Sequence, residues 1–320
     1  MDSIRVIYMT VHVIVALFGC CINASLIYLA RFHSPGKIKT YATLIMNFAF
    51  TDFLSCVADI FTLQRAIPID RTAVIFLSSG PCQFISRTAC FIAYNFMLHL
   101  LIHSLLSLLL SFSYRYYVLF KPSPRKRTVL GILALMYIPS FTHLIISSTT
   151  QGGVQEIQDI LFSRFPNFDT GCQMVSGVTD MASFASTFHV AGVSLPIFPI
   201  YTAILIIRHK IITSLGLFSA SMSNDTKSMH KQLLKALTYQ SMIPGFFVIG
   251  VVSFTLEQFN LVSHPILGYT TVTALILISV LTPMASLVFV KPYRERIRIF
   301  VGLKSSTVER FSVVFVTTTA

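Results

Sequence analysis

A few polar side chains stand within long apolar stretches of this sequence, and their spacing limits the chemistry they could do. Asp52 and Asp59 are seven residues apart and therefore share one face of a helix. His99 and His103 have the i, i+4 spacing of a metal site, but the lack of a third nearby ligand favours polar contacts between helices. Arg115 ends an apolar run as a lone cation. Because no glycine-rich phosphate loop, metal motif or nucleophile set accompanies these residues, we expect no enzyme activity, no metal and no cofactor.

The elements that carry these side chains are too apolar for a water-soluble domain. Of the 320 residues, 54% are hydrophobic and 11% are charged, whereas about a quarter of a soluble domain is charged. Because backbone groups in hydrocarbon must bond within their own segment, runs long enough to cross a bilayer are expected to be helices. The seven runs are 4–30, 41–63, 90–120, 129–148, 181–207, 236–256 and 267–290. The predicted fold class is an all-α membrane protein, a seven-transmembrane helix bundle over 1–300 with a cytoplasmic tail over 291–320.

The distribution of Lys and Arg predicts the orientation of the bundle. An alternating path places four segments on one side, and they hold nineteen of the 24 basic residues: 31–40, 115–128, 208–235 and 291–320. Basic residues concentrate in cytoplasmic loops, so we expect the N-terminus outside and the C-terminus in the cytoplasm. Arg125, Lys126 and Arg127 form a dense cluster that we interpret first as an orientation signal and a contact with the lipid bilayer. Charges confined to short loops between apolar runs exclude nucleic acid as the expected partner, despite a net charge of +12.

The six cysteines differ in their expected depth. Three fall inside apolar runs and should pack as small apolar side chains: Cys20, Cys21 and Cys56. Cys82, Cys90 and Cys172 fall on the outer side, where disulfides form. A bond from Cys172 to the top of the third helix would hold the long outer loop over the bundle, with Cys90 or Cys82 as its partner. Cys90 lies roughly 38 Å along a helix from Arg115, which matches a bilayer with its interfaces, so we favour Cys90–Cys172.

Prolines within the expected helices are candidate hinges. Each proline removes a backbone hydrogen bond, which a membrane helix tolerates where neighbouring groups satisfy the freed backbone. The candidates in the last three runs are Pro196, Pro199, Pro244 and Pro283.

Motifs in several runs resemble those of rhodopsin-like receptors. They are Gly19 and Asn23, the segment MNFAFTD at 46–52, Cys90, Ser104 and Leu108 at fixed distances before Arg115, and the prolines of the last three runs. The sequence also departs from that pattern, because Tyr114 stands in place of an acid and Thr282-Pro283 in place of Asn-Pro. Together with SYRYY at 113–117 and VKPYR at 290–294, these features resemble the nematode serpentine chemoreceptors of class delta in the Str superfamily, which are similar to G-protein-coupled receptors.

The resemblance implies a chemosensory receptor in the plasma membrane of sensory neuron cilia, which binds a small chemical ligand from outside and signals through a heterotrimeric G protein. It implies that Arg115 stabilises the resting bundle and that Asp52, Asn23 and Ser104 belong to a signalling switch. The basic cluster described above is then a second candidate contact for the G protein. A short amphipathic helix is implied from Lys291 onward. Because no acid precedes the arginine, we expect a weak restraint and raised basal signalling.

A ligand pocket is expected at the outer end, between the third, fifth, sixth and seventh helices. Helix depth alone selects its candidate residues, which are Tyr94, Asn95, His99, His189, Phe254 and Tyr269. Few charges lie at this depth, so the expected ligand is small and mostly neutral. The alternative function is a ligand-gated channel or transporter of the plasma membrane. Seven runs do not divide easily into the inverted repeats that many transporters show.

Overall fold

Seven helices of the structure are long and apolar enough to cross a membrane. The computed structural model describes residues 2–34, 39–69, 72–166, 170–171, 173–218, 235–236, 238–262 and 264–300. The spans comprise α1 (Asp2–Phe32), α2 (Lys39–Thr62), α3 (Arg87–Phe120), α4 (Lys126–Ser148), α6 (Phe184–Ser194) with α7 (Ile197–Phe218), the segment Thr238–Gln258 containing α9 (Pro244–Gln258), and α10 (Pro265–Phe289). The predicted fold class, a seven-transmembrane helix bundle, is confirmed.

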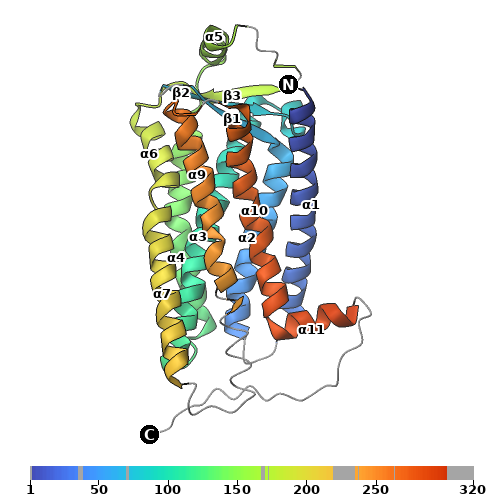
Figure 1. Ribbon diagram of the computed structural model, residues 1–320, viewed down its shortest axis with the longest axis vertical. Coiled ribbons are helices and arrows are strands. Elements are labelled where there is room, and N and C mark those ends of the chain that lie inside the picture. The colour runs from blue at the N-terminus through green and yellow to red at the C-terminus, as the bar shows by residue number, and fades with distance from the viewer. Residues whose placement is uncertain are drawn as a thin grey trace.

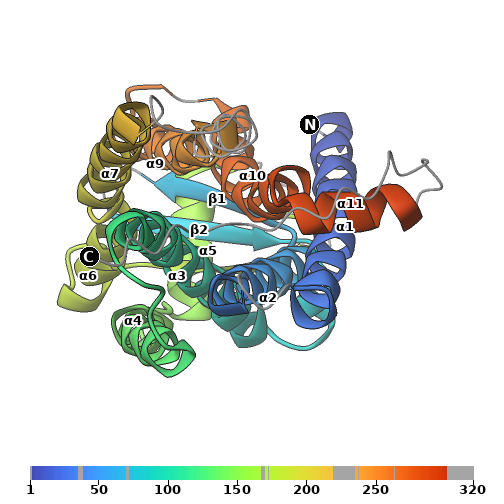
Figure 2. The ribbon, with the colours of Figure 1, turned by 90° about the horizontal axis from the view of Figure 1, so that it is seen from below.

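The spanning helices run along the long axis of the molecule, with α3 at the centre (Figures 1 and 2). Phe91, Leu101 and Phe112 of α3 are fully buried, and α3 packs against α2, α4 and α7. By contrast, Leu135 and Phe141 of α4 project outward from the bundle and are more than half exposed. This distribution is expected in a bilayer, because lipid tails cover an apolar outer face and the polar side chains turn inward.

A three-stranded antiparallel sheet lies across one end of the bundle, which we call the sheet end (Figure 1). Its strands, in spatial order, are β1 (Gln64–Ile69), β2 (Ala73–Ser78) and β3 (Met174–Val178), and helix α5 (Val154–Arg164) lies over them. Alternate side chains of β2 point in opposite directions, so Ile75 and Leu77 pack with Ile157 and Leu161 of α5, whereas Phe76 packs into the bundle core. The sequence patterns predicted only helices and did not predict this sheet.

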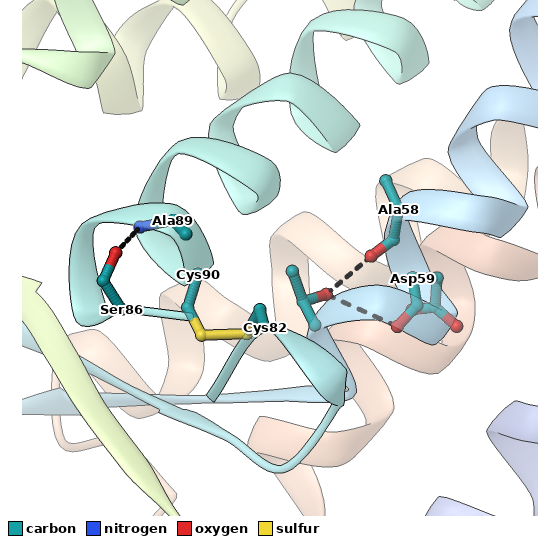
Figure 3. The surroundings of a disulfide bond; sticks show 7 residues. Ala58, Asp59, Cys82, Ser86, Ala89 and Cys90 are labelled. Atoms are coloured by element: carbon teal, nitrogen blue, oxygen red, sulfur yellow. Dashed lines mark hydrogen bonds between the residues drawn. A yellow bond between two sulfur atoms is a disulfide. The ribbon is translucent and has the colours of Figure 1, made fainter. Parts of the chain in front are cut away.

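The disulfide of the structure joins Cys82 to Cys90 (Figure 3). It ties the short 3-10 helix Pro81–Phe84 to the first turn of α3, where the Ser86 hydroxyl accepts a hydrogen bond from the backbone N–H of Ala89 at 3.1 Å. The predicted pairing of Cys90 with Cys172 is therefore wrong, and so is the alternative of Cys82 with Cys172. Cys172 itself lies outside the described residues.

Helix α11 (Lys291–Phe300) lies across the opposite end of the bundle, which we call the α11 end (Figure 1). Tyr293 is fully buried and its hydroxyl lies 2.7 Å from the Ser34 hydroxyl beyond the end of α1. Burial raises the pKa of the Tyr293 phenol, so this group remains a neutral hydrogen-bonding partner at physiological pH. The ring packs with Leu26 of α1 and Ile45 of α2, which anchors α11 to both helices.

Candidate functional site

A largely apolar cavity lies directly beneath the sheet, between α3, α6, α9 and α10. It holds about 590 Å³ of space free of atoms, its opening included. The lining residues are Val74, Phe76, Tyr94, Leu98, Val178, Met181, His189, Val190, Val193, Ser194, Phe247, Gly250, Val251, Phe254, Thr271 and Leu275. None of these side chains carries a permanent charge, so the cavity suits a small neutral molecule.

The polar groups in the cavity wall are few and differ in their partners. The Thr271 hydroxyl donates to the Leu267 carbonyl at 3.1 Å and is thereby satisfied. The His189 backbone carbonyl accepts a hydrogen bond from Nε2–H of His143 at 3.1 Å, whereas the Nδ1 atom of the His189 ring is buried and has no hydrogen-bond partner among the described residues. The His189 ring also stacks on His143, with 5.0 Å between the ring centroids. With Tyr94 and Ser194, it is one of several polar side chains in the wall that could bond a ligand.

Three of the six residues predicted for the pocket line this cavity: Tyr94, His189 and Phe254. The other three do not, and the prediction that they would do so is wrong. The Asn95 amide lies 3.4 Å from the Ser147 carbonyl, and His99 packs beside Tyr137; both therefore face α4. Tyr269 stacks on Tyr8 of α1 at 4.7 Å between ring centroids. Rotation about each helix axis therefore places these three side chains on faces other than the one that lines the cavity.

A smaller cavity of about 260 Å³ lies deeper in the bundle, between α3, α9 and α10. Phe247 lines both cavities and therefore lies at their boundary. The wall includes Ile243 and Pro244, where the sixth span changes from one helical segment to the next. Ser104 of α3 also lines it. The break in the sixth span therefore adjoins space into which side chains can move.

Arg115 joins three helices toward the α11 end. Its guanidinium donates to Oε1 of Gln240 in the sixth span at 2.7 Å and to the Tyr41 hydroxyl of α2. The guanidinium also lies over the Tyr41 ring, 5.1 Å from the centroid, and Tyr41 stacks on Tyr114. No carboxylate bonds Arg115 within the described residues. The arginine is therefore held by neutral oxygens and an aromatic face.

The predicted switch residues lie in the buried centre of the bundle. The Ser104 hydroxyl donates to Oδ1 of Asp52 at 2.9 Å, and both residues are almost completely buried. The Asn23 amide instead donates to the backbone carbonyls of Gly19 at 2.9 Å and Ser279 at 3.0 Å. The structure thus bonds Asp52 to Ser104, while Asn23 joins α1 to α10. Oδ2 of Asp52 and Oδ1 of Asn23 have no hydrogen-bond partner among the described residues.

Comparison with known proteins agrees with this arrangement. The profile of the family described as Serpentine type 7TM GPCR chemoreceptor Srd matches residues 8–299. The chain belongs to this Srd family. It is similar to Serpentine receptor class delta-18 of Caenorhabditis elegans, with 40% identity over 290 residues that cover 90% of this chain and 86% of the relative. It is also similar to class delta-19 of the same organism, with 40% identity over 286 residues, and to class delta-1, with 31% identity over 284 residues. These matches cover 88% and 87% of this chain and 84% and 76% of the relatives.

Membership in the Srd family makes this protein a multi-pass membrane chemoreceptor. Of the candidate hinges of this Srd receptor, two lie at helix breaks and two lie inside continuous helices. Pro196 separates α6 from α7, Pro199 lies near the start of α7, Pro244 begins α9 and Pro283 lies inside α10. The basic cluster Arg125, Lys126 and Arg127 is exposed at the start of α4.

Several functional candidates of this Srd receptor were not identified from the sequence. Gln240 and Tyr41 were missed as partners of Arg115, because neutral side chains of these types give no signal of an arginine contact. His12 was also missed; its Nδ1 lies 3.3 Å from Oδ2 of Asp59, and its Nε2 lies 2.7 Å from the Thr273 hydroxyl. Asp59 therefore contacts α1, and it is not part of the cavity wall beneath the sheet.

Proposed function

We propose that this chemoreceptor binds a small, mostly neutral ligand in the cavity beneath the sheet and signals to a heterotrimeric G protein at the α11 end. One observation carries the proposal: the same two spans form both sites. Leu98 of α3 and Phe254 of the sixth span line the cavity, whereas Arg115 of α3 bonds Gln240 of the sixth span toward the other end. A ligand that moves one span against the other therefore acts on the Arg115 contact.

The break at Ile243 and Pro244 is the proposed hinge for this movement. A ligand that binds one arrangement of the sixth span more tightly shifts the population toward it. Rotation about the break, with Phe247 moving at the boundary of the two cavities, separates Gln240 from Arg115. The freed guanidinium and the basic cluster at the start of α4 then form the proposed contact surface for the G protein. Pro196, Pro199 and Pro283 are proposed as secondary hinges, and Asp52 with Ser104 as the buried group whose contacts change between states.

The proposed orientation puts the sheet end outside and the α11 end in the cytoplasm, at the plasma membrane of sensory cilia. The charges support it, because Arg125, Lys126 and Arg127 and the basic residues of α11 all lie at or near the α11 end. The sheet with its covering helix α5 and the Cys82–Cys90 disulfide lie at the other end, and a disulfide suits an oxidising exterior.

A ligand screen with matched cavity variants tests this function. Cells expressing the receptor are exposed to neutral small molecules while second-messenger levels and membrane currents are recorded. Val190→Phe places a ring in the cavity wall, so a ligand response should be lost with normal surface expression. Val252→Phe adds the same ring at an exposed position of α9 that does not line the cavity, and the response should persist. A response that survives Val190→Phe would move the ligand elsewhere, and currents that persist when G proteins are blocked would favour a channel.

A further inference from the structure

The opening of the cavity beneath the sheet lies between two membrane-spanning helices. Lining residues from β2, β3, α3 and α10 are all buried. The partly exposed lining residues come from α6, from α9 and from the residue Met181 shortly before α6, and they include Val190 and Val193 of α6 and Val251 and Phe254 of α9. The cavity is not fully enclosed. Because only these lining residues reach the surface, we place its opening among them, on the side between α6 and α9.

Among the residues that the structure describes, the sheet covers the cavity at the end of the bundle. Every residue of β1 and β2 is buried, with one face of the sheet packed on α5 and the other on the bundle core. Phe76 and Val178 form the cavity ceiling, and the Met181 N–H donates to the Thr72 carbonyl at 2.9 Å beside it. Entry from water at this end would require paired strands to separate and an apolar layer to open.

The surface around the side opening is apolar and lies at the level of the membrane. Leu195 after α6 and Phe198 of α7 are 63% and 52% exposed, and Ile249 and Val252 of α9 are 49% and 46% exposed. All four belong to spans that cross the membrane, Phe184–Leu217 and Thr238–Gln258. Such side chains are covered by lipid tails, so the opening faces hydrocarbon.

We propose that ligands reach this cavity from the bilayer, through a lateral portal between α6 and α9, and that they are small lipophilic molecules with one hydrogen-bonding group. This inference depends on the proposed function in one respect: it takes this cavity to be the ligand site. The apolar wall favours a molecule that already partitions into hydrocarbon. His189 lines the cavity, is 8% exposed and has an Nδ1 atom without a hydrogen-bond partner among the described residues, so we assign to this side chain the bond to a carbonyl, hydroxyl or similar group after a small rotation of its ring. Met181 and Val251 line the portal on its two sides.

The absence of tryptophan from this chain allows a direct test of access. The sequence contains no Trp, so Phe247→Trp introduces a single tryptophan, which can be excited selectively over the tyrosines, in the inner cavity wall, where Phe247 is 1% exposed. The purified full-length receptor is reconstituted into phosphatidylcholine nanodiscs. The membrane-partitioning quencher 10-doxylnonane and the aqueous quencher iodide are then titrated separately. The proposal expects strong quenching by 10-doxylnonane and little quenching by iodide.

A matched pair of substitutions then tests whether the lipid-side quenching passes through the portal. Val251→Phe places a ring in the portal, whereas Val252→Phe places the same ring on the adjacent lipid-facing position. In the Phe247→Trp background, Val251→Phe should remove most of the quenching by 10-doxylnonane, and Val252→Phe should leave it unchanged. Equal quenching in the two variants, or efficient quenching by iodide, would overturn the proposal. If Phe247→Trp does not yield folded receptor, Leu275→Trp in the buried α10 wall, where Leu275 is 5% exposed, replaces it as the reporter, with the same expected results.

The outcome is separable from that of the proposed function, because fluorescence quenching requires no signalling. If the receptor responds to ligand but the two portal variants show equal quenching, the proposed function stands and the portal is overturned. If the portal variants differ in quenching but no ligand gives a second-messenger response, the portal stands and the proposed coupling is overturned.

Discussion

Arg115 shows how a membrane receptor can hold an arginine without an acidic partner. A carboxylate partner would add the attraction of an opposite charge to the hydrogen bonds, whereas Gln240 and Tyr41 bind the guanidinium through neutral oxygens. In the proposed mechanism, this contact orders the side chain at rest and is released on activation. Because no acid precedes Arg115, the sequence predicted a weak restraint on the resting bundle. In the structure, the neutral side chains of Gln240 and Tyr41 hold Arg115.

Replacing Gln240 by Leu should raise ligand-independent signalling. A hydrogen bond to a charged group contributes about 1.5–3 kcal/mol, so its loss shifts the resting equilibrium by about tenfold or more. The measurement is the second-messenger level without ligand, divided by the amount of receptor at the cell surface. Gln240→Glu should lower it, because the contact gains an opposite charge. Thr238→Val serves as the control, since Thr238 contacts Arg208 rather than Arg115. An unchanged basal level in Gln240→Leu, with normal surface expression, would contradict the role of this contact.

At the scale of elements, the first turn of α3 is the point where the sheet end is joined to the bundle. The Cys82–Cys90 bond closes a short segment, with a sequence separation of 8, directly between the sheet and α3. Arg87 of the same turn donates to the Gly152 carbonyl before α5 at 3.1 Å. Two independent contacts thus position the cavity ceiling relative to the helix that carries Arg115.

Peptide mapping under non-reducing conditions should recover Cys82 linked to Cys90. Cys82→Ala, Cys90→Ala and the double variant should lose the same stability, roughly 2–3 kcal/mol by loop-closure entropy, because each removes the same bond. Thermal unfolding of purified receptor measures the loss. Cys172→Ala should retain the Cys82–Cys90 peptide. A linked peptide containing Cys90 and Cys172 would instead restore the pairing favoured from the sequence.

For the molecule as a whole, the proposed coupling between the cavity and Arg115 along α3 requires the sheet end to face the outside of the cell. Epitope tags at both termini test this directly. The charge distribution predicts that the N-terminal tag binds antibody on intact cells and that the C-terminal tag binds only after permeabilisation. The reverse result would place the Arg115 contact outside the cell and exclude it from any encounter with a cytoplasmic G protein.

The seven-helix architecture could be predicted from the sequence because hydrophobicity over about 20 residues is a local property that the bilayer selects directly. For the same reason, Tyr94, His189 and Phe254 were assigned the correct depth, since depth follows from position along a helix. The rotation of each helix depends on packing against its neighbours, so the sequence could not show that Asn95 and Tyr269 face away from the cavity.

Pairings between distant segments were decided only in the tertiary structure. The Arg115–Gln240 bond spans 125 residues, and the sheet brings β3 beside β2 across nearly a hundred residues of chain. Short strands of mixed apolar residues give a weak local signal, and neutral hydrogen-bond partners give none. The local pattern of the chain thus determined that it crosses a membrane seven times. Only the packing of those helices and the sheet above them decided where the cavity closes, where it opens, and what holds Arg115.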